Sequence, residues 1–351
     1  MNAWQQIVRP GPAAEFPPEP ENAKLLVWEA AGLGVRHASV VACIDRSNMD
    51  IRVLAHAQAV ARCINADLVL AQVLEHASHA EGPQDPFYWG LKRHQCRERF
   101  DWLSQRQPFE TAPEEVLLEG KPAEQLASWA ADRESTFLVF GTHAETPAGG
   151  RGLGSVAQRL IEVAPASLLL VPPTASATRR YARILVPLDG SCRAESVIPT
   201  VVAMARAEGA EVLVMHVVPQ PQFTRAGPLE PEAVALRRKT NQRNERVART
   251  HVDRVLRYFR SNGVEARSVI MQGDAREQVQ RSALDEQVDL IVVATHGESG
   301  RADMACGSVT SYLAGHATTA LLILRNDQGW WATGARRLQE EYRSVPLRQS
   351  A

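Results

Sequence analysis

The sequence contains one pattern twice, and this repeat restricts the chain to folds built from two similar halves. In the second copy the apolar run Val288–Val293 is followed by Ala-Thr-His-Gly, nine residues and Gly-Ser-Val, over 294–309. In the first copy Phe137–Phe140 is followed by Gly-Thr-His-Ala, nine residues and Gly-Ser-Val, over 141–156. The copies are offset by 153 residues. A period this long indicates two copies of a whole domain rather than a solenoid of short repeats.

The match extends upstream and divides the chain. Val40–Asp45 matches Ile184–Asp189 at an offset of 144 residues, so the second copy has nine additional residues between its second and third strands. A chain of 351 residues suits two domains with tails. The expected division is a Pro-rich N-terminal tail 1–35, a first domain 36–173, a linker 174–179, a second domain 180–326 and a C-terminal tail 327–351.

Each copy alternates predicted strands and helices. This order predicts α/β domains with doubly wound, mostly parallel five-stranded sheets covered on both faces. The predicted first-copy strands are 40–44, 68–74, 116–118, 137–140 and 168–171, with helices 48–64, 85–105, 122–132 and 155–163. The predicted second-copy strands are 184–188, 212–218, 268–271, 288–293 and 321–324, with helices 194–208, 230–262, 275–287 and 308–316.

The composition is that of a globular protein. Hydrophobic residues make up 45% of the chain and charged residues 23%, and the formal net charge is −1. This balance gives no electrostatic reason to expect nucleic acid or an anionic membrane as a partner. No apolar run reaches the length of a membrane span, and the first ten residues lack the features of a signal peptide. We therefore expect a cytoplasmic protein without a membrane span.

The cysteines favour reduced thiols over a disulfide framework or a metal site. Their number is odd, and their spacing matches no common metal motif; they are Cys43, Cys63, Cys96, Cys192 and Cys306. Cys306 precedes a predicted helix start, where a lowered thiol pKa would favour redox chemistry. The alternative is a small residue that fills the loop. No protein side chains are expected to form a metal site.

The repeated loop has the features of a phosphate site. Small residues at both ends let backbone N–H groups approach a ligand, and the closing Gly-Ser pair lies at a predicted helix N-terminus, where unpaired N–H groups favour an anion. A simpler alternative is that Ser308 is only the N-cap of its helix. In the first copy, Ser155 and Gln158 could likewise form a capping box.

An aspartate follows the first strand of each copy. Ligands of open parallel sheets bind outside the carboxyl ends of the strands, where the strand order reverses. If the first and fourth strands are neighbours there, Asp45 or Asp189 faces the loop across one crevice and can accept hydrogen bonds from a ribose or a base amino group. The alternative is that these aspartates cap the following helix together with Ser47 or Ser191.

Competing motifs are not supported. Gly152–Ala157 fits G-x-G-x-x-A, but the preceding strand ends at Phe140, so the segment is not a tight strand-turn-helix dinucleotide site. The chain contains no P-loop and no nucleophilic Ser elbow. His143 and His296 repeat in the loop without a neighbouring ligand or triad partner, which favours loop hydrogen bonding over catalysis.

On these residues the chain resembles a tandem universal stress protein. ATP-binding members of that family carry G-x2-G-x9-G-S/T after the fourth strand, an Asp after the first, and a Val on the second that contacts adenine. The resemblance implies a nucleotide site in the second domain at Pro187, Asp189, Val217, Val293, Ala294, Gly297, Gly307, Ser308 and Val309. It implies a weaker site in the first domain at Asp45, Val73, Gly141, Gly154, Ser155 and Val156.

Each copy departs from the family pattern at one glycine. Ala294 replaces the first Gly in the second copy, where it ends a strand and a negative φ makes the methyl group inexpensive. Ala144 replaces the second Gly in the first copy, inside the turn, where a positive φ would cost about 1 kcal/mol. In addition, Cys43 replaces a Pro of the family pattern and Arg46 a Gly. The second domain is therefore expected to be the better site.

The resemblance implies a non-catalytic regulator of the stress response that binds ATP, AMP or ADP, with or without Mg²⁺. One alternative is a slow ATP hydrolase, although the sequence offers no evident base or Arg/Lys clamp for the γ-phosphate. Another is a nucleotide-free interaction scaffold. The family resemblance also implies that the two fifth strands pair edge to edge, within one chain or between the chains of a homodimer. The sequence does not identify a protein partner.

Overall fold

The structure is a computed structural model that describes residues 38–75, 86–109, 111–133, 136–142, 152–177, 180–219, 231–296 and 306–325. The interpretations of the two tails, of Ala144 and His143, and of Gly297 concern residues outside these ranges. Within the described helices, none combines the length and apolar character that a membrane crossing requires.

Strands and helices alternate through both halves, as the repeat predicts. The first half contains β1 (Ser39–Cys43), α1 (Asp50–Ile64), β2 (Asp67–Leu74), α2 (Pro86–Arg106), β3 (Glu114–Glu119), α3 (Pro122–Ala131), β4 (Thr136–Gly141), α4 (Ser155–Val163) and β5 (Ser167–Val171). The second contains β6 (Arg183–Pro187), α5 (Cys192–Glu195), α6 (Ile198–Glu208), β7 (Glu211–Val218), α7 (Pro231–Ser261), β8 (Ala266–Gln272), α8 (Ala275–Asp285), β9 (Leu290–Ala294), α9 (Ser308–His316) and β10 (Ala320–Leu324).

One predicted helix is divided. The sequence predicts a continuous helix over 194–208, whereas α5 ends at Glu195 and α6 begins at Ile198. Pro199 lies in the first turn of α6. Its ring would clash with the carbonyl of residue 195 in a continuous helix, and it has no N–H to donate, so the helix is interrupted before it.

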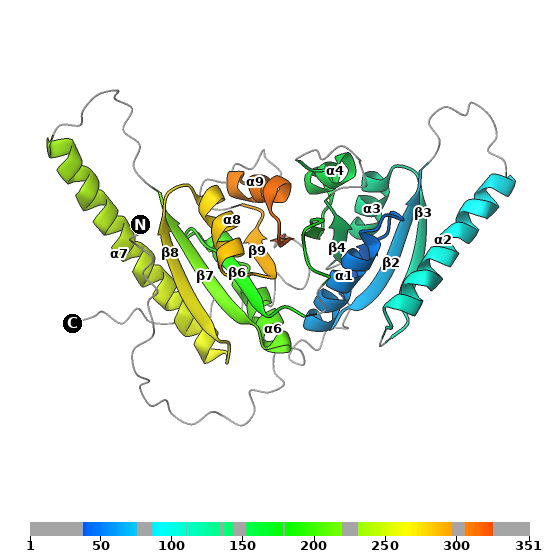
Figure 1. Ribbon diagram of the computed structural model, residues 1–351, viewed down its shortest axis with the longest axis horizontal. Helices are drawn as coiled ribbons and strands as arrows, with labels where there is room; N and C mark the ends of the chain where they lie inside the picture. Colours follow the sequence, from blue (N-terminus) through cyan, green and yellow to red (C-terminus); the bar gives the residue numbers. More distant parts are fainter. Residues whose placement is uncertain are drawn as a thin grey trace.

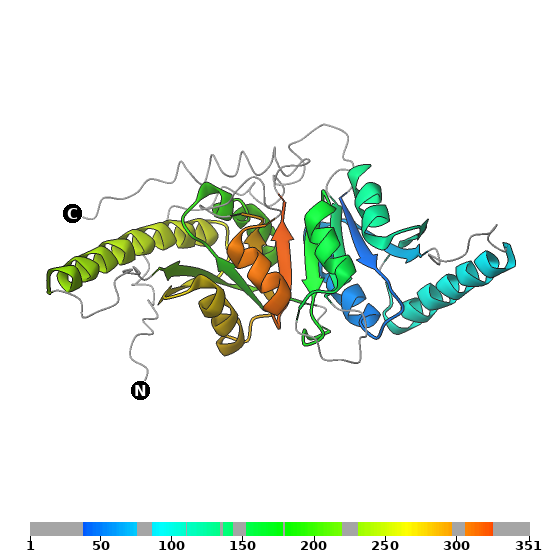
Figure 2. The same ribbon diagram turned by 90° about the horizontal axis from the view of Figure 1, so that it is seen from above.

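The two halves form one ten-stranded sheet with the order β3-β2-β1-β4-β5-β10-β9-β6-β7-β8 (Figures 1 and 2). Every neighbouring pair is parallel except the central one, where β5 and β10 run antiparallel with Leu169 opposite Leu322. The expected edge-to-edge pairing of the fifth strands is thus confirmed within one chain, and each strand covers an edge that its half would otherwise expose.

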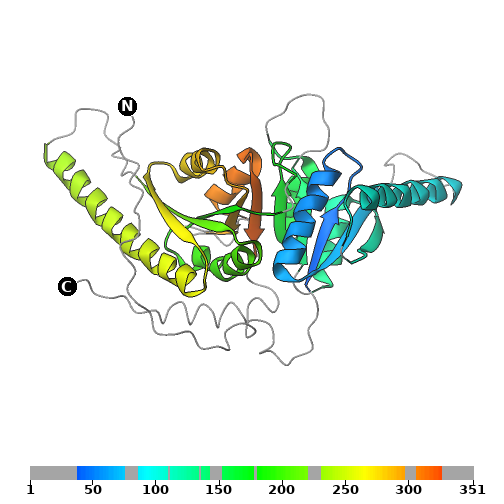
Figure 3. The same cartoon turned by 60° about the horizontal axis from the view of Figure 1, so that its bottom comes forward.

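The sheet is covered on both faces. Side chains of α1, α2, α6 and α7 pack on one face, and those of α3, α4, α8 and α9 on the other. α2 and α7 lie at opposite ends of the molecule (Figure 3). Both faces are filled mainly by aliphatic side chains, which is typical of a buried parallel sheet.

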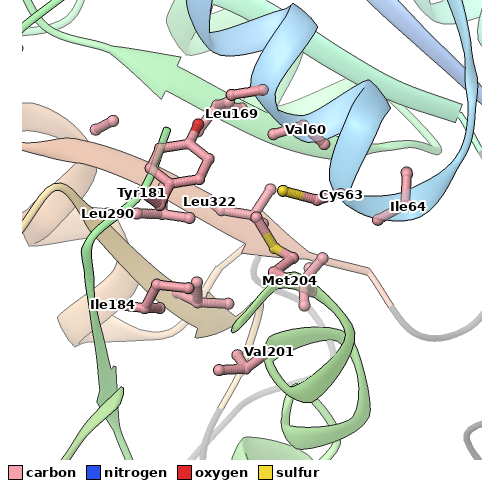
Figure 4. Close-up of a cluster of buried hydrophobic side chains, with 14 of the residues drawn as sticks. Val60, Cys63, Ile64, Leu169, Tyr181, Ile184, Val201, Met204, Leu290 and Leu322 are labelled. Atoms are coloured by element: carbon pink, nitrogen blue, oxygen red, sulfur yellow. The ribbon is translucent and has the colours of Figure 1, made fainter. Parts of the chain in front are cut away.

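The core continues across the junction of the halves. Figure 4 shows Tyr181, Leu322 and Met204 of the second half close to Cys63 and Leu169 of the first. Polar contacts reinforce this packing: the Tyr181 hydroxyl lies 2.9 Å from His56 Nδ1, and Arg62 forms a 2.8 Å ion pair with Glu208. The buried junction makes independent unfolding of one half costly.

Candidate functional site

The strand order reverses beside the repeated loop in both halves. β1 lies between β2 and β4, and β6 lies between β7 and β9. Because these strands are parallel, the carboxyl ends of β1 and β4, and those of β6 and β9, lie at the same edge of the sheet. The condition for a crevice between the post-strand Asp and the loop is therefore met in each half.

The ends of each repeated loop are fastened together by one backbone hydrogen bond. Gly307 N–H donates to Thr295 O at 2.7 Å, and Gly154 N–H donates to Thr142 O at 2.8 Å. Thr310 Oγ1 also donates to Ala294 O at 3.0 Å and ties α9 to the end of β9. The closing glycines are thus held directly beside the strand ends from which the loops leave.

Both helices that follow the loops begin with a glycine N-cap. Gly307 precedes α9 with φ −66° and ψ 163°, and Gly154 precedes α4 with φ −62° and ψ 153°. A glycine has no side chain that could accept hydrogen bonds from the first N–H groups of the helix, so these groups can still donate to a bound anion. The interpretations of Ser308 as N-cap and of Ser155 with Gln158 as a capping box are wrong, because both serines already lie inside their helices.

The post-strand aspartates adopt the same local turn. Asp189 Oδ1 accepts the N–H of Ser191 at 2.9 Å, and Asp45 Oδ1 accepts that of Ser47 at 2.9 Å. Ser191 is in turn the N-cap of α5, where its Oγ accepts the N–H of Ala194. The helix-capping alternative thus holds for Ser191 alone, because α1 has Met49 as its N-cap without a side-chain cap and neither aspartate caps a helix itself. Asp45 and Asp189 are both exposed.

The remaining predicted residues lie at the same edge of the sheet. In the second half Val293 is buried, whereas Pro187, Val217, Ala294, Gly307 and Val309 are half-buried and Ser308 is exposed. In the first half Val73, Gly141 and Gly154 are half-buried, and Ser155 and Val156 are exposed. Ala294 does not have a positive φ, as predicted.

The two crevices differ in how far their strands pair. At the carboxyl end, β1 and β4 pair as far as Ala42–Val139, whereas β6 and β9 stop one position earlier, at Leu185–Ile291. Leu188 N–H donates to Met215 in β7, so strand alternation turns the nitrogen of Pro187 towards β9. Proline has no hydrogen to donate there, which ends the ladder early. In the first half the residue that corresponds to Pro187 is Cys43, which has a backbone N–H to donate.

The turn after the first strand also differs between the halves. Gly190 has a φ of +88°, and no heavy atom lies within 4 Å of the position that a Cβ would occupy. Its counterpart Arg46 has a φ of 67°, a conformation that costs a non-glycine residue about 1 kcal/mol. Arg46 Nη1 also donates to Gln95 Oε1 at 3.1 Å. The turn after the first strand therefore has a long side chain in the first half and none at the corresponding position in the second.

A partly buried polar cluster, which the sequence did not predict, lies next to the turn that follows β6. His251 Nε2 and Arg254 Nη2 each lie 2.6 Å from Glu195 Oε1, and the rings of His251 and His216 meet edge to face at 5.8 Å. Burial and then the charge of His251 lower the pKa of His216, whereas Asp189 and a hydrogen bond with the Leu188 backbone oppose this shift. A single indication of this cluster is present in the sequence: His216 occupies the position that corresponds to Gln72 in the first half.

The first half has a different buried pair at the corresponding place. Asp50 Oδ2 lies 2.6 Å from Arg99 Nη2, and Asp50 Oδ1 accepts the N–H of Asp45 at 3.2 Å. Burial raises the pKa of Asp50 to about 7, although Arg99 opposes the shift. Through the Asp45 N–H, this pair holds the turn of the first crevice against α2.

The chemistry of the second loop does not favour a reactive thiol. Cys306 is buried, and burial raises its pKa, which leaves it protonated and a weak nucleophile at neutral pH. Burial outweighs the opposing charge of Arg325, so the structure favours the alternative, a small residue that fills the loop, over the lowered pKa considered for this helix start. Across the described ranges, no group of three or more His, Cys, Asp or Glu side chains is arranged to hold a metal ion.

Comparisons with known proteins by sequence and by structure point to the same family. The universal stress protein family model matches the chain twice, at residues 38–172 and 180–325. The universal stress protein Sll1388 of Synechocystis is 24% identical over 154 residues, which is 42% of this chain and 99% of that protein. A crystal structure of a universal stress protein from Archaeoglobus fulgidus covers 83% of this chain and 97% of its own, with 14% identity and a TM-score of 0.58.

Some members of the family bind nucleotides. One solved universal stress protein is in complex with cAMP; it is 25% identical, covers 38% of this chain and 96% of its own, and has a TM-score of 0.27. The A. fulgidus structure shares the two-half fold over nearly its whole length. With two family-model matches that together cover most of its length, this chain belongs to the universal stress protein family as a tandem member with two universal stress protein domains.

Proposed function

We propose that the protein is a non-catalytic regulator that binds one adenine nucleotide, ATP or its product ADP or AMP, in the crevice of the second half. Asp189 accepts hydrogen bonds from the ribose or the base, and Pro187, Val217, Val293 and Ala294 line the adenine and ribose end. The phosphates lie on the loop between Gly297 and Gly307 and on the first N–H groups of α9, at Ser308 and Val309. Mg²⁺, where present, is held by the phosphates rather than by a cluster of protein side chains.

The observation that carries this proposal is the glycine N-cap of α9 beside the end of β9. The hydrogen bond from Gly307 N–H to Thr295 O brings the helix N-terminus to the point of strand reversal. A helix N-terminus without a capping side chain attracts an anion. Asp189, which is exposed, follows the neighbouring strand β6. One crevice thus offers donors for phosphate and an acceptor for the sugar or base.

The first half is the weaker site in this proposal. Its residues Asp45, Val73, Gly141, Gly154, Ser155 and Val156 repeat the arrangement, but β1 and β4 pair further along and Arg46 lies in the turn after β1. We also propose that the chain divides into a first domain at 36–173 and a second domain at 180–326. Regulation then follows if nucleotide occupancy favours one arrangement of the surface that partners contact.

Titration of Mg²⁺-ATP into the full chain, followed by calorimetry and by thermal unfolding, tests the proposal. We expect submillimolar binding, a higher midpoint of unfolding as ligand binds the folded state, and no release of phosphate over hours. GTP is the matched control and should bind about tenfold more weakly, since one mispaired polar group costs about that factor. Absence of binding at millimolar ATP to a folded chain would contradict the proposal, and sustained phosphate release would contradict its non-catalytic part.

A further inference from the structure

The amino-terminal part of α7 is an arm that the core does not use. From Val234 to Val247 no residue of this helix is buried, and the helix reaches past the edge of the sheet (Figures 1 and 3). The buried contacts of α7 begin at Ala248. One side of this part of the helix is half-buried, at Thr240, Asn241 and Asn244, so the open question is what contacts the opposite, exposed side.

One face of the arm combines positive charge with apolar side chains. Leu236, Lys239, Arg243, Arg246 and Val247 follow a helical spacing that places them along one face. Leu236 is 60% exposed and Val247 62%, and the three cations between them are exposed as well. The ion pairs among the described residues do not include these three cations. We call this set of five residues the arm face.

The charge of α7 limits what can bind there. The helix carries nine Arg and Lys against three Asp and Glu, a net charge of +6 in a chain of net charge −1, so the rest of the chain carries −7. A second copy packed arm to arm would bring two positive faces together. A nucleic acid or anionic membrane would meet the negative charge of the remainder of the molecule. The occupant must therefore be a short acidic segment with apolar side chains.

The chain itself contains such a segment. Residues 15–29 carry Glu15, Glu19, Glu21 and Glu29 against the single cation Lys24, and they include the apolar run Leu-Leu-Val-Trp at 25–28. Its net charge of −3 matches the three cations of the arm face. The segment lies outside the described residues, so only its composition enters here.

The chain between this segment and the sheet is long enough. The arm reaches past the edge strand β8, which is separated from β1 by seven strand spacings in the sheet order, or ~34 Å. An extended chain covers ~3.4 Å per residue, so the residues between Glu29 and β1 reach ~30 Å and those between Glu15 and β1 reach ~80 Å. Glu15, Glu19 and Glu21 can thus reach the arm without unfolding any strand, whereas Glu29 lies too close to β1 to do so.

We propose that residues 15–29 dock on the arm face of α7 within the same chain, with Glu15, Glu19 and Glu21 on Lys239, Arg243 and Arg246 and their apolar run over Val247. This contact carries the N-terminal segment of the first half to the second half. It is independent of nucleotide binding. The equivalent arm of the first half, α2, is a poorer acceptor, because its Arg93 and Arg99 are already paired with Glu119 and Asp50.

Photo-crosslinking in the full chain tests the docking. Benzoylphenylalanine replaces Leu236 or Val247, and Leu91 on α2, 47% exposed, is the matched control position. We expect crosslinks from 236 and 247 into residues 15–29 of the same chain and none from 91. The triple variant Glu15→Lys, Glu19→Lys, Glu21→Lys should lower the yield about tenfold, since an exposed ion pair contributes a factor of about two. Adding Lys239→Glu, Arg243→Glu and Arg246→Glu should restore it.

Other results would overturn the docking. Mixing chains labelled with heavy and light nitrogen distinguishes crosslinks within a chain from those to a second copy. Crosslinks between copies, adducts with nucleic acid or lipid, crosslinks to any other segment, or no crosslinks at all each contradict the proposal. A crosslinking yield that the charge-reversal variants leave unchanged also contradicts the proposal. The circular dichroism of each variant confirms that it is folded.

Discussion

The two halves share a fold and a loop length, yet they differ at the crevice. In the second half Pro187 ends the β6–β9 pairing one position earlier than in the first, and Gly190 has open space where a Cβ would lie. In the first, the pairing continues to Ala42–Val139, and Arg46 reaches across to Gln95. The helix N-termini are nearly identical in conformation. Among the described residues, the difference therefore lies in the strand pairing and in the turn after the first strand, and the loop positions Ala144 and Gly297 fall outside them.

The largest expected effect is at the glycine N-caps. Gly307→Asp should lower ATP affinity at least about 100-fold, or ~2.7 kcal/mol, because a carboxylate then occupies the α9 N-terminus and repels phosphate. The φ of −66° suits any residue and Asp is a good N-cap, so the fold should persist. Calorimetric titration measures the affinity.

Two controls sharpen this result. Gly307→Asn also caps the helix but adds no charge, so its loss should be clearly smaller. Gly154→Asp makes the same change in the first half and should leave the measured affinity within about twofold, a difference of ~0.4 kcal/mol. A larger loss from Gly154→Asp than from Gly307→Asp would reverse our assignment of the better site.

The next effect is at the aspartates. Asp189→Ala should weaken ATP binding about tenfold, since a hydrogen bond to a charged group contributes about 1.5–3 kcal/mol. Asp45→Ala removes the same turn hydrogen bond in the first half and should leave the affinity unchanged. Urea unfolding of both variants should show similar losses of stability, because each loses one backbone N–H acceptor. Equal effects of the two variants on binding would argue for two equivalent sites.

A smaller effect is expected from the residue that ends the β6–β9 ladder. Pro187→Cys restores an N–H directed to β9, so the strands can pair further and narrow the crevice. We expect about fivefold weaker binding, since one such bond contributes about 1 kcal/mol. Cys43→Pro makes the opposite change in the first half and should not weaken binding. Stronger binding by Pro187→Cys would show that strand separation is not what opens the site.

The smallest effect concerns pH. The pKa of His216 is lowered by burial and by His251, so the unfolded chain binds a proton there more readily than the folded chain. Stability from this group is complete above the unfolded pKa of ~6.5 and is lost as pH falls. His216→Gln, which copies Gln72 of the first half, should reduce the loss of unfolding free energy between pH 7 and 5. An identical decline in both proteins would exclude His216 as its source.

Much of this comparison could be predicted from the sequence, because the repeat determines which residues correspond. The strands, the central pairing of β5 with β10 and the neighbouring positions of β1 and β4 follow from apolar runs and constant spacing. The break before Pro199 was missed although proline gave the signal. The contacts of His216 with His251 and of Asp50 with Arg99 join residues distant in the sequence, and only the packing of α7 on β7 and of α2 on β2 brings them together.

The most direct test of the account is the number of ATP molecules bound per chain, measured by native mass spectrometry across a titration to millimolar Mg²⁺-ATP. We expect one molecule per chain over the submillimolar range, and none when Gly307→Asp is present. A second molecule bound with the same affinity would contradict the difference between the halves. No bound ATP on a folded chain would contradict the nucleotide site itself.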